Sequence, residues 1–283
     1  MPELPEVETV RRDLEDLVSG RRIIDLNADA STLPLLAGPT VTLDELRNSL
    51  VGRTIRDIGR IGKYLLFTLD DGRTLVVHLR MTGRLIWRSS KEPEEPYERA
   101  RLVLDNDHDL RWADLRKFGT WRLIDDVRTL EAKLGPEPIA AGFTLSRFRR
   151  ALGAGNAPIK SVLLDQRRLA GIGNIYADEA LFEARIRPDT PASALSRPAS
   201  KRLFHACREV LEQGIRNRGA SFQDYVDAQG EPGRNHIYVQ VFRRTGEPCY
   251  RCGSTIQRIV VGGRSTHFCG RCQRRPRRPP SKG

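Results

Sequence analysis

Two closely spaced cysteine pairs near the C-terminus constrain this chain more than any other feature. Cys249 and Cys252 form one CxxC pair, Cys269 and Cys272 form a second, and 16 residues separate the two pairs. Four thiolates at this spacing suit a tetrahedral zinc ion in a closed, structural site. The alternative is a redox-active CxxC motif, which would occur once and before a helix. The sequence therefore predicts one structural zinc ion.

The segment between the two pairs has the pattern of a β-hairpin. Residues 255–261 and 264–268 are strand-like and are separated by Gly262-Gly263. Arg258 and Arg264 on this hairpin could hold a phosphate backbone, or they could form a solvated charged face. The fifth cysteine, Cys207, lies among apolar residues of a helical segment, where we expect it to fill the core.

The charge balance indicates a polyanionic partner. The chain has 48 Lys and Arg residues against 36 Asp and Glu residues, a net charge of +12 and a pI near 10.0. Nucleic acid is the simplest partner for such a surplus, although a merely soluble basic protein fits it too. No apolar run reaches the ~18 residues of a membrane span, and the N-terminus lacks the apolar core of a signal peptide. We therefore expect a cytoplasmic protein without a membrane partner.

The pattern of apolar residues changes three times along the chain. Residues 5–18 predict an amphipathic helix, and residues 21–125 alternate like a β-sandwich or barrel, interrupted by a short helix near 43–50. A linker near 134–138 precedes helical periodicity, and the last 45 residues return to short strands. Strands are expected at 23–26, 54–61, 64–69, 74–79, 102–104 and 120–124. Helices are expected near 144–152, 158–166, 173–183 and 195–216.

The N-terminus offers a catalytic interpretation. Removal of Met1 would leave Pro2 with a secondary α-amine, a group whose pKa is near ~8, so a good fraction is neutral. Such an amine can form a Schiff base with an aldehyde-like carbon, and Glu3 could supply a proton. The alternative is that these prolines and acids simply start a helix.

Three further segments could contact nucleic acid. Gly171-Ile172-Gly173-Asn174 could present backbone N–H groups to a phosphate, with Lys160, Arg167 and Arg168 nearby, or could be an ordinary turn between helices. Residues 78–83 and 114–119 end strands and carry Met, Arg and Phe side chains. These could fill a gap in a base stack, or could be ordinary core and surface residues.

Seven motifs in order give the chain a resemblance that covers nearly its whole length. They are PELPEVE at 2–8, IGKYLLF at 61–67, HLRMTG at 78–83, DLRKFG at 114–119, LGPEP at 134–138, DQRRLAGIGNIYADEALF at 165–182 and GRSTHFC at 263–269. Together with the four cysteines, they resemble bacterial formamidopyrimidine-DNA glycosylases, which repair oxidised purines.

The resemblance implies an α+β multidomain fold. An N-terminal catalytic β-sandwich with flanking helices would occupy residues 1–134, and a helix–two-turn–helix domain would occupy 135–238. The four-cysteine zinc-finger hairpin would follow at 239–273, with a disordered basic tail at 274–283.

The resemblance also implies a bifunctional glycosylase and AP lyase. Pro2 would attack the anomeric carbon of the damaged nucleotide, Glu3 would protonate the opening sugar ring, and Glu6 would support them. Lys63 corresponds to the lysine linked to phosphate contact and β-elimination, and Arg264 to the arginine linked to δ-elimination.

The expected partner is double-stranded DNA containing oxidised bases, bound by a monomer in the bacterial nucleoid. Met81, Arg116 and Phe118 correspond to the trio that fills the hole left by the extruded base, and Arg116 would face the orphaned cytosine. Residues 221–238 correspond to the loop that closes over the extruded purine. The other DNA-binding positions implied are His78, Tyr97, Asn156, Lys160, Asn174, Tyr176, Ser221 and Tyr238.

Some positions depart from the usual family pattern. Arg80 replaces a frequent glycine, Tyr97 a frequent histidine and Asn156 a usual basic residue. Phe242-Arg243-Arg244 stands for the common Tyr-Gly-Arg, and residues 234–236 of the closing loop are unusual. These departures bear on lesion range rather than on the nucleophile or the zinc ligands.

Two alternatives have weaker support. An endonuclease VIII-type enzyme for oxidised pyrimidines would usually have glycine in place of Leu4 and would lack the predicted trio. A zinc-containing DNA-binding protein without catalysis would be favoured if Pro2 or Glu3 were missing, and both are present.

Overall fold

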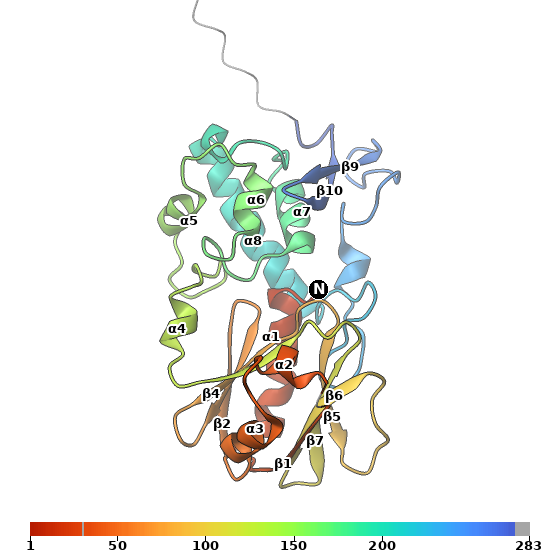
Figure 1. The fold of residues 1–283 in the computed structure, drawn as a ribbon. Coiled ribbons are helices and arrows are strands. Elements are labelled where there is room, and N and C mark those ends of the chain that lie inside the picture. Colours follow the sequence, from red (N-terminus) through yellow and green to blue (C-terminus); the bar gives the residue numbers. More distant parts are fainter. Residues whose placement is uncertain (30, 275–283) are drawn as a thin grey trace, which may run out of the picture. The chain divides into compact units, whose positions relative to one another are not determined.

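The computed structural model describes residues 1–29 and 31–274 and divides the chain into two compact units (Figure 1). Unit 1 contains Met1–Lys133 and Gly214–His236, and unit 2 contains Leu134–Gln213 and the chain from Ile237. The segment 214–236 thus groups with the N-terminal part by its contacts, whereas the sequence analysis places it with the helical domain. The predicted basic tail lies outside the described residues, apart from Arg274. No described helix is long and apolar enough to cross a membrane.

Unit 1 contains two four-stranded antiparallel sheets that share one apolar core, which confirms the predicted β-sandwich with flanking helices. One sheet has the order β1-β6-β7-β5 and the other the order β2-β3-β4-β8. The strands of the first sheet are β1 (Ile23–Ala28), β6 (Glu98–Leu104), β7 (His108–Asp114) and β5 (Gly83–Ser89). Those of the second are β2 (Ile55–Ile61), β3 (Tyr64–Leu69), β4 (Thr74–His78) and β8 (Thr120–Ile124).

Helix α1 (Leu4–Val18) belongs to the same core. Val7, Val10, Leu14 and Val18 recur at helical spacing and are at most 1% exposed, so one stripe of the helix is buried. The helix begins with a proline in its first turn, where a missing N–H costs nothing. This packing fixes the start of the chain. The shorter helices of this unit are α2 (Leu33–Leu36), α3 (Leu43–Leu50) and α4 (Arg128–Glu131).

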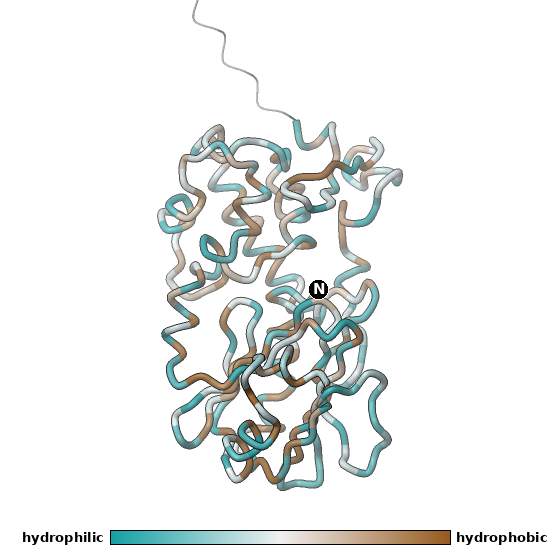
Figure 2. The backbone as a smooth tube through the Cα atoms, in the orientation of Figure 1, coloured by the Kyte–Doolittle hydropathy of each residue, from teal (hydrophilic) through white to brown (hydrophobic). Residues whose placement is uncertain are grey.

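Strands β5 and β7 are not among the strands expected from the sequence. In β7, Asp109 and Arg111 are fully buried and lie 3.3 Å apart as an ion pair. Arg111 also donates to the carbonyl oxygen of Ser89 at 2.8 Å. Charged residues inside a sheet break the expected alternation. Here the two charges neutralise each other, and Arg111 also donates to a carbonyl oxygen 22 positions away. The connection between β5 and β6 is hydrophilic (Figure 2).

Unit 2 is mainly helical and ends in the finger hairpin. The predicted helices are found, with ends that differ by up to a few residues, because terminal turns fray. Phe148 and Leu152 of α5 are buried, as are most residues of α7. The elements are α5 (Leu145–Leu152), α6 (Ile159–Leu164), α7 (Asn174–Glu183), η1 (Ala192–Ala194), α8 (Arg197–Arg216), η2 (Asn235–Tyr238), β9 (Ile256–Val261) and β10 (Arg264–Cys269). The last residues of α8 and the first of η2 belong to unit 1.

Candidate functional site

The N-terminal residues predicted to be catalytic lie in a buried environment of unit 1. Pro2 is buried, Glu3 is 2% exposed and Glu6 is 1% exposed. The Glu6 carboxylate accepts the backbone N–H of Glu3 at 2.8 Å through one oxygen and the backbone N–H of Ala220 at 2.8 Å through the other. Glu6 therefore joins the start of α1 to the segment that begins near Gly219.

The segment after α8 is anchored against α1. The Tyr225 hydroxyl donates to the carbonyl oxygen of Glu6 at 3.2 Å, and its burial, together with the nearby Glu6 charge, raises the pKa of Tyr225 well above its ordinary value. Gly219 has a φ of +80°, and a Cβ there would come within 2.9 Å of the Glu6 side chain. Only glycine fits this turn without strain.

The predicted closing loop has its own internal bonds. Ser221 Oγ donates to the carbonyl oxygen of Tyr225 at 2.6 Å and accepts the N–H of Gly233 at 2.9 Å. Arg218 bridges Asp13 of α1 and Asp227 of the loop. The hydroxyl of Ser221 thus closes the loop on itself, and the salt bridges fix its far side to α1.

Lys63 lies in the tight turn between β2 and β3 and is 6% exposed. Arg60 supports this turn by donating to the Gly62 carbonyl oxygen at 2.9 Å and by pairing with Glu8 of α1 at 2.9 Å. Burial would raise the pKa of Glu8, but hydrogen bonds from Arg11, Arg12 and Arg60 outweigh it and lower the pKa to about 2. Helix α1 thus holds the turn that carries Lys63 in place.

The three side chains predicted to fill the base stack are in contact with one another. Met81 and Phe118 are 41% and 50% exposed on two different loops. Arg116 places its guanidinium 4.6 Å from the centroid of the Phe118 ring and 3.2 Å from the Met81 sulfur. The three side chains, called here the wedge cluster, form one exposed group.

A buried aspartate that the sequence analysis did not select holds both loops. Asp114, 1% exposed, accepts the Thr82 hydroxyl at 2.5 Å and the backbone N–H groups of Arg116 and Gly119 at 3.1 and 2.8 Å. Its place as the first residue of the DLRKFG motif is the signal that could have identified it. Asp114 therefore sets the backbone of the wedge cluster.

The indole of Trp112 lies directly beneath the two loops. A Cβ on Gly83 would meet the Trp112 ring at 2.7 Å, and one on Gly119 would overlap the same ring more closely still. Both positions therefore require glycine, because any side chain would collide with a fully buried ring.

His78 and Tyr97, which are also predicted to bind DNA, differ in their exposure. His78 is 6% exposed, accepts the backbone N–H of Arg80 on Nδ1 at 2.9 Å and packs edge-on against Tyr64. Burial, with the charges of Arg80 and Lys63, lowers its pKa to about 3, so the ring is neutral at physiological pH. Tyr97 is 52% exposed. Arg80 has a φ of +53°, a conformation that suits the glycine usual at this position.

In unit 2, the predicted phosphate-binding Lys160 is fully buried. Its Nζ lies 2.6 Å from Asp178 Oδ1 of α7 and donates to the Ser265 carbonyl oxygen and to Thr266 Oγ1, each at 2.9 Å. The other oxygen of Asp178 accepts the backbone N–H and the ring Nδ1 of His267 at 2.9 and 3.1 Å. The group of Lys160, Asp178 and His267, called here the buried ionic cluster, joins α6, α7 and β10.

Asn174 and Arg264 lie next to this cluster. Asn174 Nδ2 donates to the Ser265 carbonyl oxygen at 3.1 Å, the same oxygen that Lys160 contacts. Arg264 is the adjacent residue and is exposed at the start of β10. The structure thus brings together three residues that the sequence analysis predicted to contact phosphate.

The remaining predicted DNA-binding residues of unit 2 are dispersed. Tyr176 is 1% exposed, and Tyr238 is 51% exposed. Asn156 is exposed and accepts the Ser193 hydroxyl at 2.9 Å. Of the unusual Phe242-Arg243-Arg244 run, Arg244 is 6% exposed and donates to the carbonyl oxygens of Gln240 and Pro248. Arg244 therefore orders the chain before the finger.

Glu179 of α7 also orders this chain segment. Its carboxylate accepts the backbone N–H groups of Gln240, Val241 and Phe242 at 2.7, 3.0 and 2.9 Å. Burial is the main reason that the pKa of Glu179 is raised to about 6, although these hydrogen bonds oppose the rise.

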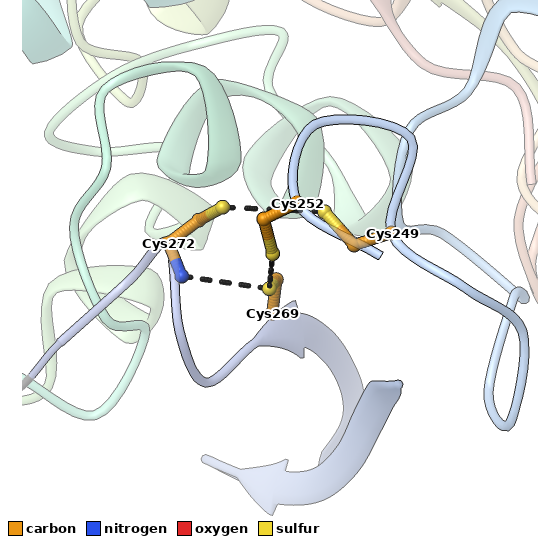
Figure 3. A group of neighbouring side chains, drawn as sticks. All are labelled: Cys249, Cys252, Cys269 and Cys272. Carbon is orange, nitrogen blue, oxygen red and sulfur yellow. Dashed lines mark hydrogen bonds between the residues drawn. The ribbon is translucent and has the colours of Figure 1, made fainter. Parts of the chain in front are cut away.

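The four cysteines converge at one point of the finger (Figure 3). Their sulfur atoms all lie within 4.8 Å of one another. Cys249 and Cys272 are 4.0 Å apart and Cys252 and Cys269 are 3.5 Å apart. Tetrahedral ligands at the usual Zn–S distance of ~2.3 Å would be ~3.8 Å apart, so the site fits one structural zinc ion.

Comparison with known proteins agrees with this arrangement in both units. Residues 1–121 match the formamidopyrimidine-DNA glycosylase N-terminal domain, residues 134–226 match its H2TH domain, and residues 246–275 match the zinc finger found in FPG and IleRS. The chain belongs to the formamidopyrimidine-DNA glycosylase family. This confirms the family, the fold class and the zinc finger that the sequence predicted.

Individual glycosylases of the family are similar over nearly the whole chain. The formamidopyrimidine-DNA glycosylase of Heliobacterium modesticaldum is 46% identical over 97% of this chain and 100% of its own. That of Herpetosiphon aurantiacus is 44% identical over 96% of this chain and 100% of its own.

Solved structures show the same similarity. A Lactococcus lactis FPG mutant, in a complex with Fapy-dG containing DNA, has a TM-score of 0.89 and 40% identity over 97% of this chain and 100% of its own. The Lactococcus lactis Fpg bound to abasic-site DNA has a TM-score of 0.88 and 40% identity, over 96% of this chain and 100% of its own.

Proposed function

We propose that this protein excises oxidised purines from double-stranded DNA and then cuts the strand at the abasic site. Both relatives are glycosylases by name, and the similar solved structures contain lesion or abasic DNA. The observation that carries the proposal is the start of α1, where a proline that becomes N-terminal after methionine removal is buried beside two carboxylates.

The proposed reaction uses the Pro2 amine as a covalent catalyst. The nitrogen attacks C1′ of the damaged nucleotide, the bond to the base breaks, and the base leaves with a proton. Glu3 donates a proton to the ring oxygen as the sugar opens, which leaves a Schiff base between Pro2 and C1′. An amine needs no activated water for this step, because it becomes the covalent partner itself.

Strand cleavage then follows by elimination. The Schiff base acidifies the neighbouring sugar carbon, so loss of a proton expels the 3′ phosphate, and a second elimination expels the 5′ phosphate. We assign Lys63 to the first step and Arg264 to phosphate binding in the second. Glu6 positions the reaction, because its two oxygens join Glu3 to Ala220.

The wedge cluster would offset the cost of base extrusion. A base inside a duplex must leave the stack before C1′ can be attacked, at a cost of a few kcal/mol. The exposed Met81 and Phe118 side chains can occupy the vacated stack, while the Arg116 guanidinium can hydrogen-bond the orphaned cytosine. The contacts of Arg116 with both neighbours preorganise this group.

A trapping assay tests the nucleophile. Borohydride should reduce the Schiff base and link the mature protein to DNA that contains 8-oxoguanine or a formamidopyrimidine. Pro2→Gly, or a form that retains Met1, should lose most of the trapped product. Pro5→Ala is the matched control, since it alters the first turn of α1 but keeps the nucleophile.

Undiminished nicking by the Pro2 variants would refute the assignment. The same assay on oxidised pyrimidine duplexes tests the substrate class, because a preference for them would contradict excision of purines. We further propose that the protein acts as a monomer at the bacterial nucleoid, which sedimentation with and without DNA would test.

A further inference from the structure

Helix α5 presents arginines on the face opposite its buried side. Phe148 and Leu152 pack into unit 2, whereas Arg147 and Arg150, three residues apart, are exposed on the other side. Within the described part of the chain, neither guanidinium forms an ion pair. Two unneutralised charges therefore lie side by side on one helix face.

A second pair of arginines comes from the turn before α7. Arg167 and Arg168 follow α6, and both lie near Asp165, at 3.1 and 3.6 Å. Arg168 also donates to the carbonyl oxygens of Ala151 and Leu152, at 3.3 and 3.0 Å, where α5 ends. These hydrogen bonds fix the turn against α5.

The two pairs line one hollow of about 760 Å³. This volume lies within the range of roughly 300–1,000 Å³ that is usual for ligand-binding pockets. Asp165 is the one carboxylate paired with its arginines among the described residues, so the hollow keeps a charge surplus of three. It is lined by Pro136, Arg147, Arg150, Ala151, Gly153, Arg167 and Arg168.

We propose that this hollow, the α5 arginine site, binds the phosphate backbone of duplex DNA that flanks the lesion. It would be a second DNA-binding surface of unit 2, separate from the residues around Asn174 and Arg264. The choice of DNA as partner rests on the proposed function. Exposed arginines with a charge surplus suit phosphates, which accept half to two-thirds of protein–DNA hydrogen bonds.

The chain itself limits how far this site lies from the predicted phosphate-binding residue Asn174. Six peptide units separate Arg168 from Asn174, a reach of at most ~22 Å when fully extended. Phosphates of one DNA strand rise ~3.4 Å each along the axis. The Arg168 end of the α5 arginine site would therefore engage phosphates within about six positions of a phosphate bound near Asn174.

Another arginine-lined hollow of unit 2 is a weaker candidate. Arg185, Arg251, Arg271 and Arg274 surround Cys252 and Cys272 of the finger. Four thiolates around a zinc ion carry two negative charges, and Glu183 pairs with Arg251 at 2.6 Å. These arginines are therefore largely neutralised, unlike those of α5.

Binding to undamaged DNA at a series of salt concentrations tests the proposal. Arg147→Ala/Arg150→Ala should weaken binding to a 30-base-pair duplex about tenfold. The slope of log K against log salt should fall by about 1.8, that is ~0.9 for each phosphate that is no longer neutralised. Arg147→Lys/Arg150→Lys keeps both charges and should retain most of the slope.

The matched control removes two exposed charges elsewhere in unit 2. Arg197→Ala/Lys201→Ala on α8 has the same change in net charge and lies outside the hollow. An unchanged slope in the α5 double variant, or a fall no larger than that of the control, would overturn the proposal.

Trimmed duplexes locate the bound phosphates. Each duplex carries a stable abasic analogue at a fixed position. The loss of affinity caused by Arg147→Ala/Arg150→Ala should disappear when the DNA on one side of the analogue is shortened to about four base pairs. It should persist when the DNA on the other side is shortened. Equal penalties on all duplexes would contradict binding to the flank. Failure of the proposed function would differ, since the protein would then not prefer abasic-analogue DNA over undamaged DNA.

Discussion

Two buried aspartates organise the candidate sites of the two units, and they do so differently. Asp114 in unit 1 accepts hydrogen bonds from a hydroxyl and two backbone N–H groups. Asp178 in unit 2 pairs with the ammonium group of Lys160 and with His267. Asp114 leaves the functional side chains of its loops exposed, whereas Asp178 neutralises a residue that the sequence predicted to touch DNA.

The difference shows that a buried aspartate can have either of two roles. It can order loops whose functional side chains stay exposed, or it can join the helices and strands that carry exposed functional residues. Around Asp114, the predicted residues themselves form the exposed cluster. Around Asp178, Lys160 orders the strand on which Arg264 stands, through the Ser265 carbonyl oxygen. Lys160 therefore supports the predicted phosphate-binding residues from inside the protein in this structure.

Zinc removal should produce the largest difference between the two units. Structural zinc sites in finger peptides contribute roughly 10–16 kcal/mol of folding free energy, so chelation or Cys272→Ser should collapse the hairpin that carries Arg264. DNA affinity should fall more than about 100-fold, while hydrogen exchange in the unit 1 sheets stays slow. Full affinity after verified metal loss would refute a structural role for the ion.

Asp178→Ala should be the most damaging single change in the buried ionic cluster. Removing one partner leaves the Lys160 charge buried, which costs about 3–5 kcal/mol. Denaturant unfolding would measure the loss. Lys160→Met combined with Asp178→Leu should recover part of it, since no charge then remains buried. A single-variant loss below about 1 kcal/mol would show that the cluster is not needed for folding.

Asp114→Asn should affect activity more than stability. Loss of one acceptor costs about 1–3 kcal/mol, but a loosened wedge cluster should lower kcat/KM for lesion excision by up to about 100-fold. Asp109→Asn is the control, because Asp109 is equally buried in β7 but bonds Arg111 instead of the loops. Equal losses of kcat/KM in both variants would count against a positioning role for Asp114.

The two units should also respond oppositely to pH. The pKa of His78 is about 3 when folded and ~6.5 when unfolded, so unit 1 loses stability as the pH falls between these values. The pKa of Glu179 is about 6 when folded and ~4.5 when unfolded. The stabilisation that Glu179 contributes to unit 2 is therefore present below pH ~4.5 and is lost as the pH rises through about 6.

Hydrogen exchange resolved by unit measures these two trends separately. His78→Asn should reduce the loss of stability of unit 1 at acid pH. Glu179→Gln should reduce the change in stability of unit 2 through about pH 6. Profiles that keep their wild-type shape in both variants would show that other groups control them.

The sequence predicted most elements because local patterns specify them. The α1 stripe, the hairpins of the second sheet and the cysteine spacing depend on residues close in the chain. Strand β7 was not predicted, because its buried Asp109 and Arg111 are compensated by distant carbonyl oxygens and by each other. Asp114 and Asp178 were missed partly for the same reason, since their partners include Thr82 and His267, which lie 32 and 89 positions away.

For the site, motifs indicated which residues matter but not how they act. The wedge trio was predicted as a set, and the contact of Arg116 with both neighbours is visible only in the structure. The burial of Lys160 could not be inferred from its neighbours, because the strand that covers it lies about 100 residues further on.

The Trp112 indole beneath the two loops of the wedge cluster makes their movement measurable by fluorescence. The protein has three tryptophans, Trp87, Trp112 and Trp121, and all of them lie in unit 1. Trp112 touches the space beneath Gly83 and Gly119, so movement of either loop changes the surroundings of its indole. Intrinsic emission can therefore follow insertion into a duplex in real time, without a label on protein or DNA.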